Sequence, residues 1–220
     1  MAQLNAFRLS LTLILFLFSA LTFGQKKFKV TAIETGNFRS KYVFTDEKGN
    51  TIRELDTSKY FTCFTTNSKH FVYFAILGMK GLKEGWAAVD ADENILFTVL
   101  NTSYGEPTPD DLWEDAIRII DSNNLIGFAN SKGKIFIKPQ FEAASTFHNG
   151  KAIIARSCKQ EPWDEHAKES DCHHYSTVCT EHGYINKKGK IKKLGAFSFE
   201  EIKNEIKWVE PNIEYEYYYD

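Results

Sequence analysis

Short apolar stretches separated by turn-forming residues run along most of the chain. In the clearest example, Phe128 precedes the tetrapeptide 130–133, and the apolar residues 135–137 follow it. The side chain of Asn130 can bond the backbone two residues further on, and Gly133 can take a positive φ without a steric penalty. This combination is typical of a type I turn that ends on a left-handed residue, so it predicts a β-hairpin.

The same hairpin sequence returns along the chain and indicates an internal repeat. Residues 126–135 and 182–191 share Gly, an aromatic residue, Asn, Lys, Gly, Lys and Ile in the same order. Residues 42–51 form a third copy. Residues 86–95 form a degenerate fourth copy, which has Glu93 in place of the turn Gly. The predicted turn positions are Asn130 and Gly133, Asn186 and Gly189, and Asp46 and Gly49.

A second element accompanies each clear hairpin. Residues 147–154 and 112–119 both open with a polar turn and continue as an apolar strand. Each repeat is therefore predicted to be an antiparallel meander, and neighbouring repeats must stack because one unit cannot bury a face alone. We expect an all-β fold in which hairpin and meander repeats stack into one curved sheet, as a barrel-like or sandwich-like array, with a short C-terminal helix.

The end of the chain carries the strongest helix pattern. Residues 197–207 contain Ser198 and Glu201 at the spacing of a capping box. We expect this helix to cover an open end of the sheet, as stacked repeats require. Residues 213–220 alternate aromatic and acidic side chains, and we favour a closing edge strand over a frayed tail.

The first 24 residues resemble a secretory signal. Arg8 precedes the apolar run 11–18, and the small residues Thr22 and Gly24 place a cut before Gln25. The alternative is an uncleaved anchor, but the apolar run is short for a span of ~20 residues. We expect cleavage and an extracytoplasmic protein, periplasmic, surface-associated or secreted, without a membrane span. The expected organisation has five segments: 1–24 signal peptide, 25–101 N-terminal β region with degenerate repeats, 102–111 loop or linker, 112–196 clear repeats with an insert at 156–181, and 197–220 C-terminal helix and aromatic tail. A single sheet that runs through both sides of 102–111 is equally compatible with the sequence.

The repeat sequence resembles the WG-repeat family. Residues 126–141 follow its unit, in which Trp-Gly-Tyr-Ile-Asp-x-x-Gly-Lys leads to Ile-x-Pro-x-Phe, and residues 147–154 and 183–191 continue the match. The resemblance implies an all-β repeat protein, generally noncatalytic and often extracytoplasmic. The Trp-Gly pair itself is nowhere intact: the Trp position holds Tyr42, Trp86, Ile126 and His182, and the Gly position holds Val43, Ala87, Gly127 and Gly183.

The last repeat carries a Cys- and His-containing insert, because the short loop between Ile120 and Leu125 becomes residues 156–181 in the later copy. Alignment of the repeats pairs residues whose numbers add to about 336, which sets Cys158 almost opposite Cys179. We therefore predict a disulfide in an oxidising compartment, which on the chain-entropy model contributes ~3 kcal/mol. Cys172 and Cys63 would remain, paired with each other or free.

A metal site is the alternative use of the insert. Its ligands would be Cys172, His174, Cys179 and His182, but their spacing matches no standard zinc pattern. No Gly-x-Ser-x-Gly, His-Glu-x-x-His, Walker or Gly-x-Gly-x-x-Gly motif occurs in the sequence, so we expect no enzyme and no cofactor. The formal net charge of −2 gives no electrostatic basis for nucleic-acid binding.

These observations favour a noncatalytic binding or structural module of the cell envelope or exterior. Loops on a rigid scaffold carry recognition, so we expect the binding surface at 156–181 and 102–111, with a protein or glycan partner. The alternatives are an envelope metal-binding protein or hydrolase centred on the insert, and an inhibitor of a secreted toxin. The insert residues expected to bind are Trp163, His166, His173 and His174.

Overall fold

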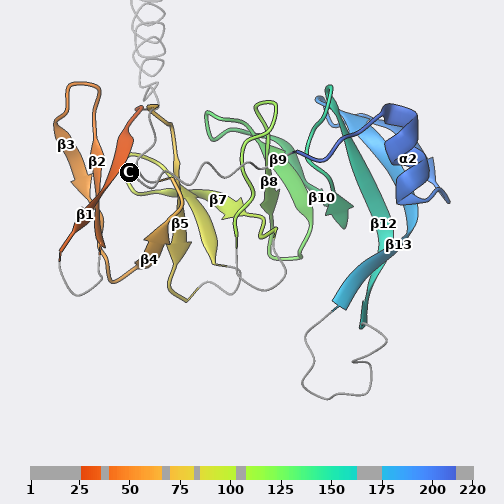
Figure 1. Cartoon of the computed structure of the whole chain (residues 1–220), viewed down its shortest axis with the longest axis horizontal. Helices are drawn as coiled ribbons and strands as arrows, with labels where there is room; N and C mark the ends of the chain where they lie inside the picture. Colours follow the sequence, from red (N-terminus) through yellow and green to blue (C-terminus); the bar gives the residue numbers. More distant parts are fainter. Residues whose placement is uncertain are drawn as a thin grey trace, which may run out of the picture.

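The computed structural model describes residues 26–35, 40–65, 70–81, 85–102, 108–162 and 175–211. Within these ranges the chain forms strands β1 to β14 and one short helix, α2, which confirms the all-β prediction. The strands form three antiparallel sheets that follow one another along the long axis of the molecule in chain order (Figure 1). The predicted signal peptide and residues 213–220 lie outside the described residues.

The first two sheets contain the N-terminal half of the chain and the first clear repeat. The first sheet has the order β1-β2-β3, and the second has seven strands in the order β10-β9-β8-β7-β6-β5-β4. Their bounds are β1 Lys29–Glu34, β2 Ser40–Thr45, β3 Thr51–Glu54, β4 Tyr60–Cys63, β5 Ala75–Met79, β6 Trp86–Val89, β7 Ile95–Val99, β8 Ile117–Ile120, β9 Ile126–Ala129 and β10 Ile135–Phe141.

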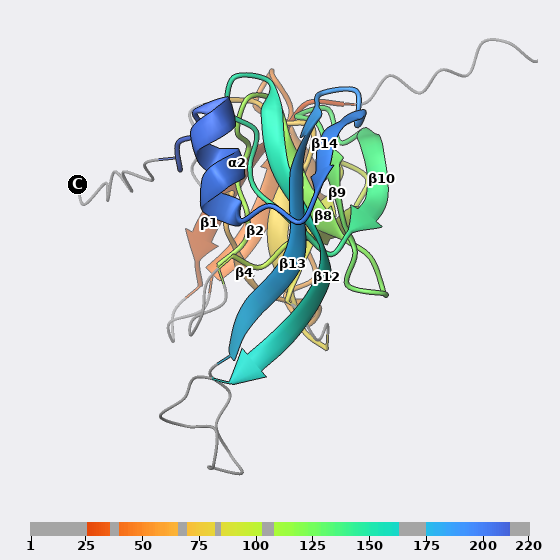
Figure 2. The same ribbon diagram turned by 90° about the vertical axis from the view of Figure 1, so that its right-hand side faces the viewer.

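The third sheet contains the last repeat and carries the helix. Figure 2 shows α2 lying against β12 and β13, so the helix covers a face of this sheet instead of the predicted open end. Ser198 and Glu201 form the predicted capping box. The bounds are β11 Ala143–Ala144, β12 Lys151–Pro162, β13 Tyr175–Asn186, β14 Ile191–Gly195 and α2 Phe199–Ile206.

Three sheets replace the one curved sheet that we expected. The chain changes sheet at Glu142, since β10 ends at Phe141 and β11 begins at Ala143. Strands that switch sheets make such corners, and each corner lets two sheet faces enclose a core. Segment 102–111 is not a boundary between sheets, because β7 pairs with β8 across it through Val99 and Ile119.

The cores between sheets are shared by neighbouring repeats. Phe44 of the first sheet and Phe28, which directly precedes β1, pack with Leu77 of the second sheet. Phe128 and Phe141 of the second sheet pack in one cluster with residues of β12 and β13. These side chains are all buried, so repeats exclude water from one another's faces, as the sequence predicts.

Five turns share one geometry. The Oδ1 atom of the opening Asp or Asn accepts hydrogen bonds from the backbone N–H groups two and four residues further on. The residue three positions further on has a positive φ. The predicted turns are confirmed, and one further copy joins them. The pairs are Asp46 with Gly49, Asp90 with Glu93, Asp121 with Asn124, Asn130 with Gly133, and Asn186 with Gly189.

The contacts of Glu93 explain why the degenerate copy at 86–95 lacks the turn Gly. Its φ is 67°, in the left-handed region that costs a non-Gly residue about 1–2 kcal/mol. The side chain is mostly buried and accepts a hydrogen bond from the Tyr60 hydroxyl at 3.0 Å. It also forms ion pairs with Arg53 and Lys59. Glu93, in the second sheet's turn, is therefore linked to Arg53 of the first sheet and to the segment 59–60 that follows that sheet. These contacts offset the cost of its left-handed backbone.

The Gly position of the repeat has a separate steric role. A Cβ atom on Gly127 would lie 2.5 Å from the carbonyl oxygen of Ile137, and one on Gly183 would overlap the carbonyl oxygen of Lys193. Both contacts are with the backbone of the next strand, where the pairing of β9 with β10 and of β13 with β14 is irregular. Only Gly permits this approach, because other residues carry a Cβ.

Consecutive repeats are also connected by a carboxylate. Glu114, in a tight turn, accepts hydrogen bonds from the backbone N–H groups of Asn149 at 2.5 Å and Gly150 at 2.9 Å. Asn149 and Gly150 occupy the matching turn of the next repeat, and both have positive φ. Lys187 bonds the Glu114 carbonyl and lies 3.8 Å from its carboxylate. The turn of one repeat is thus bound directly to its successor.

Candidate binding groove beside the disulfide

The hairpin of β12 and β13 is longer than the strands that flank it. β11 pairs only with Ile154 and Ala155, and β14 only with residues His182–Ile185. Beyond Cys158 and Cys179 the two described strands pair only with each other, and they extend past the neighbouring sheet (Figure 1).

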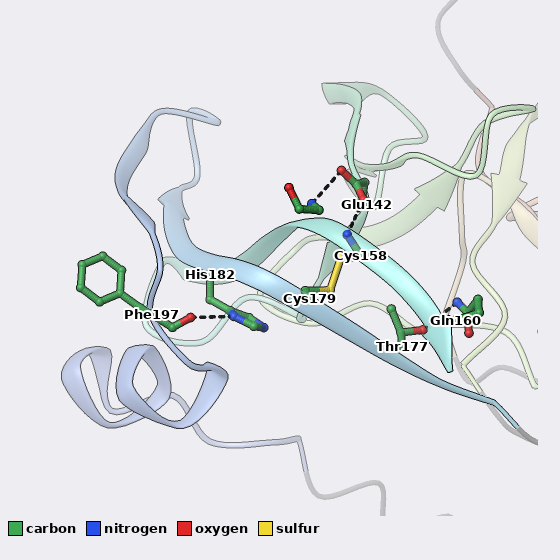
Figure 3. The surroundings of a disulfide bond; sticks show 8 residues. Glu142, Cys158, Gln160, Thr177, Cys179, His182 and Phe197 are labelled. Atoms are coloured by element: carbon green, nitrogen blue, oxygen red, sulfur yellow. Dashed lines mark hydrogen bonds between the residues drawn. A yellow bond between two sulfur atoms is a disulfide. The ribbon is translucent and has the colours of Figure 1, made fainter. Parts of the chain in front are cut away.

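A disulfide joins Cys158 and Cys179 where this two-stranded ribbon begins (Figure 3). The two residues are directly opposite in the ladder, which confirms the predicted pairing. The register is one residue away from the expected one, because Ala155 pairs with His182 and not with Glu181. The next pair outward on the same side, Gln160 and Thr177, shares a side-chain hydrogen bond of 2.8 Å.

Glu142 fixes the backbone beside the disulfide. Ser157 has a φ of 55°, a left-handed conformation that turns successive N–H groups toward one side. The Glu142 carboxylate accepts the N–H of Cys158 at 2.8 Å and that of Ser157 at 3.0 Å (Figure 3). These bonds, first that of Cys158, hold the pKa of Glu142 below its ordinary value. The sheet corner is thereby tied to the base of the ribbon.

A groove of about 850 Å³ lies between the ribbon and the second sheet. One wall includes Cys158, Lys159 and Thr177, from the insert. The other includes Pro109 and Asp111, from the predicted linker. The structure therefore brings together parts of the two segments that the sequence suggested as a binding surface.

Asp110 and Arg118 form a largely buried ion pair that lines the groove. Asp110 is 4% exposed, and its two carboxylate oxygens accept the Arg118 Nη2 at 2.7 Å and Nε at 3.0 Å. The remaining Arg118 Nη1 donates to the carbonyl of Ala144 in the third sheet. Sequence reasoning missed this pair, because Asp110 resembled an ordinary loop residue. It binds the linker to both sheets and gives the groove a rigid base.

Two buried polar atoms of the groove residues have no hydrogen-bond partner in the described part of the chain. They are Thr146 Oγ1 and Asn101 Oδ1. Thr146 is only 7% exposed, and its own carbonyl is used by the indole N–H of Trp208. A buried polar atom without a partner costs about 1–3 kcal/mol, and because solvent does not reach these two atoms, they lie beneath the groove surface and cost stability there.

Asp111 and Trp113 complete the linker side of the groove. The Asp111 side chain remains solvent-accessible, but the groove walls surround it, and this reduced solvation raises the pKa of its carboxyl. Trp113 is half-buried, which leaves part of its indole accessible. The arrangement can bind a ligand through hydrogen bonds on one side and an aromatic face on the other.

The residues suggested for the tip of the insert, Trp163, His166, Cys172, His173 and His174, lie outside the described residues. Of the alternative metal ligands, Cys179 is oxidised in the disulfide and has no thiolate to offer. His182 Nδ1 lies 2.8 Å from the carbonyl of Phe197 (Figure 3). The described residues contain no group of three or more His, Cys, Asp or Glu placed to hold a metal ion.

Cys63 lies far from the insert along the chain, and its thiol is buried outside the disulfide. Burial raises its pKa to about 12, which keeps it protonated and unreactive at neutral pH. Among the residues that the structure describes, no helix has the length and apolar character needed to cross a bilayer.

Comparison with known proteins gives one match. Residues 126–155 match the family described as "WG containing repeat". No curated protein and no solved structure matches the chain. The matched segment runs from β9 to the first half of β12 and includes Gly127, the turn at Asn130, and the residues bound by Glu114. The chain thus carries a WG containing repeat at 126–155, and this match confirms the resemblance to the WG-repeat family.

Proposed function

We propose that this WG-repeat protein is a noncatalytic binding module of the cell envelope or exterior, and that its ligand occupies the groove beside the disulfide. The observation that carries the proposal is a groove of ligand-site volume, walled by parts of both predicted recognition segments and by the half-buried Trp113. The Cys158–Cys179 disulfide supports a location in the cell envelope or exterior, since such bonds persist in oxidising compartments.

The rigidity of the groove supports binding. Asp110, Arg118 and Glu142 hold its base and one corner through charge-assisted hydrogen bonds to backbone and side chains of two sheets. A site that is already ordered loses less conformational entropy when a ligand binds. The alternative of a metal centre in the insert is weaker, because Cys179 is not available as a thiolate.

The test compares two variants that each remove one aromatic side chain. Trp113→Ala removes the accessible indole of the groove, and Phe61→Ala removes an exposed ring on β4 outside it. Immobilised wild-type protein and both variants are exposed to envelope extract of the source cells, and the retained proteins and glycans are identified by mass spectrometry.

We expect a component that wild type and Phe61→Ala retain and Trp113→Ala loses, and we expect its mass to be unchanged after incubation with the protein. Equal retention by all three proteins, or no retention, would argue against the groove. A changed mass of the retained component would show that the protein is catalytic.

A further inference from the structure

The outer part of β12 has one edge without a neighbouring strand in the described chain. β11 pairs only with Ile154 and Ala155, whereas β12 continues to Pro162 with β13 alone beside it. An open strand edge presents backbone N–H and C=O groups to which another extended chain can bind. The orientation of these groups decides whether this edge can accept a strand.

The register of the ribbon shows which backbone groups point outward. In an antiparallel ladder, the two residues of a closely spaced pair turn their N–H and C=O groups away from each other. Cys158 and Cys179 form such a pair, with Cα atoms 4.0 Å apart, and the N–H of Cys158 is bonded to Glu142 instead of β13. The pair of Gln160 and Thr177 lies two positions further out (Figure 3). The N–H and C=O of Gln160 therefore point to the open edge as well.

This edge borders the groove. Cys158, Lys159 and Gln160 all lie in the groove wall. Glu142 ends the open edge on one side through its bonds to the backbone, and Pro162 ends it on the other because it has no N–H. A segment added between these limits would lie along the groove and direct every second side chain at its walls.

The charge of the groove selects the kind of segment. Carboxylates outnumber cations in the lining by four to two, and one of each is used in the buried ion pair described above. The remaining carboxylates are Asp111, Glu142 and Glu210, and the remaining cation is Lys159. Asp111 and Glu210 are exposed and form no ion pair within the described chain. The excess negative charge favours a cationic ligand.

The rest of the wall is mainly apolar. An indole face attracts a cation as well as apolar groups. Trp113 and Asp111 are two residues apart and line the same groove, so one ammonium or guanidinium group can contact both an aromatic ring and a carboxylate. The apolar side chains that are partly exposed at the groove are Phe64, Leu100, Trp113, Ile120, Leu125 and Pro211.

We propose that the groove binds a basic, partly apolar polypeptide segment, which joins the open edge of β12 beside Gln160 as an additional strand and directs Lys or Arg side chains toward Asp111 and Trp113. This inference rests on the proposed binding function and adds the class of partner. The backbone of the segment would bond the edge, its apolar side chains would cover the apolar wall, and its cations would balance the carboxylates.

The experiment measures binding of synthetic peptides to the purified, oxidised protein by calorimetry. The probe is the heptapeptide Lys-Lys-Val-Val-Lys-Lys-Val, because each face of this sequence presents both Lys and Val when it is extended. One comparison peptide has Glu in place of every Lys, and the other is the basic peptide with N-methylated Val residues, which cannot donate the strand hydrogen bonds. We expect a Kd in the micromolar range for the basic peptide and binding at least tenfold weaker for both comparison peptides.

Two proline variants form a matched pair that tests the edge. Gln160→Pro and Thr177→Pro both remove the side-chain hydrogen bond between these residues, and both place Pro where the N–H faces away from the partner strand. Only Gln160→Pro removes the backbone donor on the groove side. We expect Gln160→Pro to weaken binding of the basic peptide about tenfold and Thr177→Pro to change it less than twofold, with equal thermal midpoints for the two variants.

A second set of variants tests the charge. The double change Asp111→Asn with Glu210→Gln should weaken binding of the basic peptide about fivefold and reduce its dependence on salt. Glu47→Gln is the control, because Glu47 is an exposed carboxylate outside the groove, and it should leave binding unchanged.

Four results would overturn the inference: no binding of the basic peptide at millimolar concentration, equal binding of the acidic or the N-methylated peptide, equal binding by both proline variants, or self-association of the protein that Gln160→Pro abolishes. The last result would assign the edge to a second copy of this chain. If the peptides fail while envelope extract still yields a component that requires Trp113, the partner class is wrong and the proposed binding function stands. If both experiments fail, the groove is not a binding site.

Discussion

The Gly position of the WG repeat offers a steric test of the fold. Replacing Gly183 with Ala places a Cβ against the carbonyl of Lys193 in the adjacent strand β14. The obstacle is backbone on both sides, so neither strand can yield without losing ladder hydrogen bonds. Gly49→Ala is the matched control, because its Cβ would meet nothing within 4 Å.

The magnitudes follow from these contacts. Overpacking costs about 1–3 kcal/mol, and each ladder hydrogen bond lost adds about 1 kcal/mol, so we expect ~3 kcal/mol for Gly183→Ala. Gly127→Ala should cost slightly less, since its Cβ lies 2.5 Å from backbone atoms and overlaps less. Gly49 has a φ of 84°, and there Ala pays ~1 kcal/mol after the gain in unfolded-state entropy.

Urea unfolding followed by intrinsic fluorescence measures all three free energies, and thermal scans provide a second reading. For a chain of this size, ~3 kcal/mol corresponds to a midpoint lower by roughly 6–12 °C. If Gly183→Ala and Gly49→Ala prove equally stable within ~0.5 kcal/mol, the steric explanation of the Gly position is refuted.

Three further predictions concern polar contacts. Glu114→Ala should lower the free energy of unfolding by ~1 kcal/mol in urea titrations, because two backbone N–H groups of the next repeat lose their acceptor, whereas Glu114→Gln should retain part of it. Replacing Cys158 and Cys179 together with Ser should lower the free energy of unfolding by up to ~3 kcal/mol in the same assay, and no loss would show that the disulfide does not stabilise the fold. The Glu142 contacts should be complete above its ordinary pKa of 4.5 and should weaken as the pH falls through its lowered folded pKa. The check is a loss of protection of the Cys158 amide, relative to its intrinsic exchange rate at each pH below 4.5, which Glu142→Gln should not show.

Features governed by short sequence separation could be predicted from the sequence. The turns at Asn130 and Asn186 depend on a side chain and a Gly within the same few residues, and both formed as expected. The pairing of Cys158 with Cys179 followed from repeat alignment with an error of one residue in the register. One turn was missed because Asn124, and not Gly, occupies its left-handed position.

Features that depend on packing between sheets could not be predicted. The sheet corner at Glu142 arises where two faces enclose a core, and no local signal marks it. The Asp110–Arg118 pair and the unpartnered Thr146 hydroxyl become visible only when three segments meet around one groove. The sequence suggested the two loops that border the site, but the groove between them is a tertiary feature.

The contact made by Glu114 sets the direction and the length of the array. A repeat with this carboxylate can hold a successor, provided that the successor presents a tight turn with two free N–H groups. In the next repeat the same position is Asn149, whose side chain has no carboxylate, so that repeat can receive a neighbour but cannot hold one. A further unit therefore could not be attached to this repeat through the same contact, whereas a duplicated unit upstream of it could be.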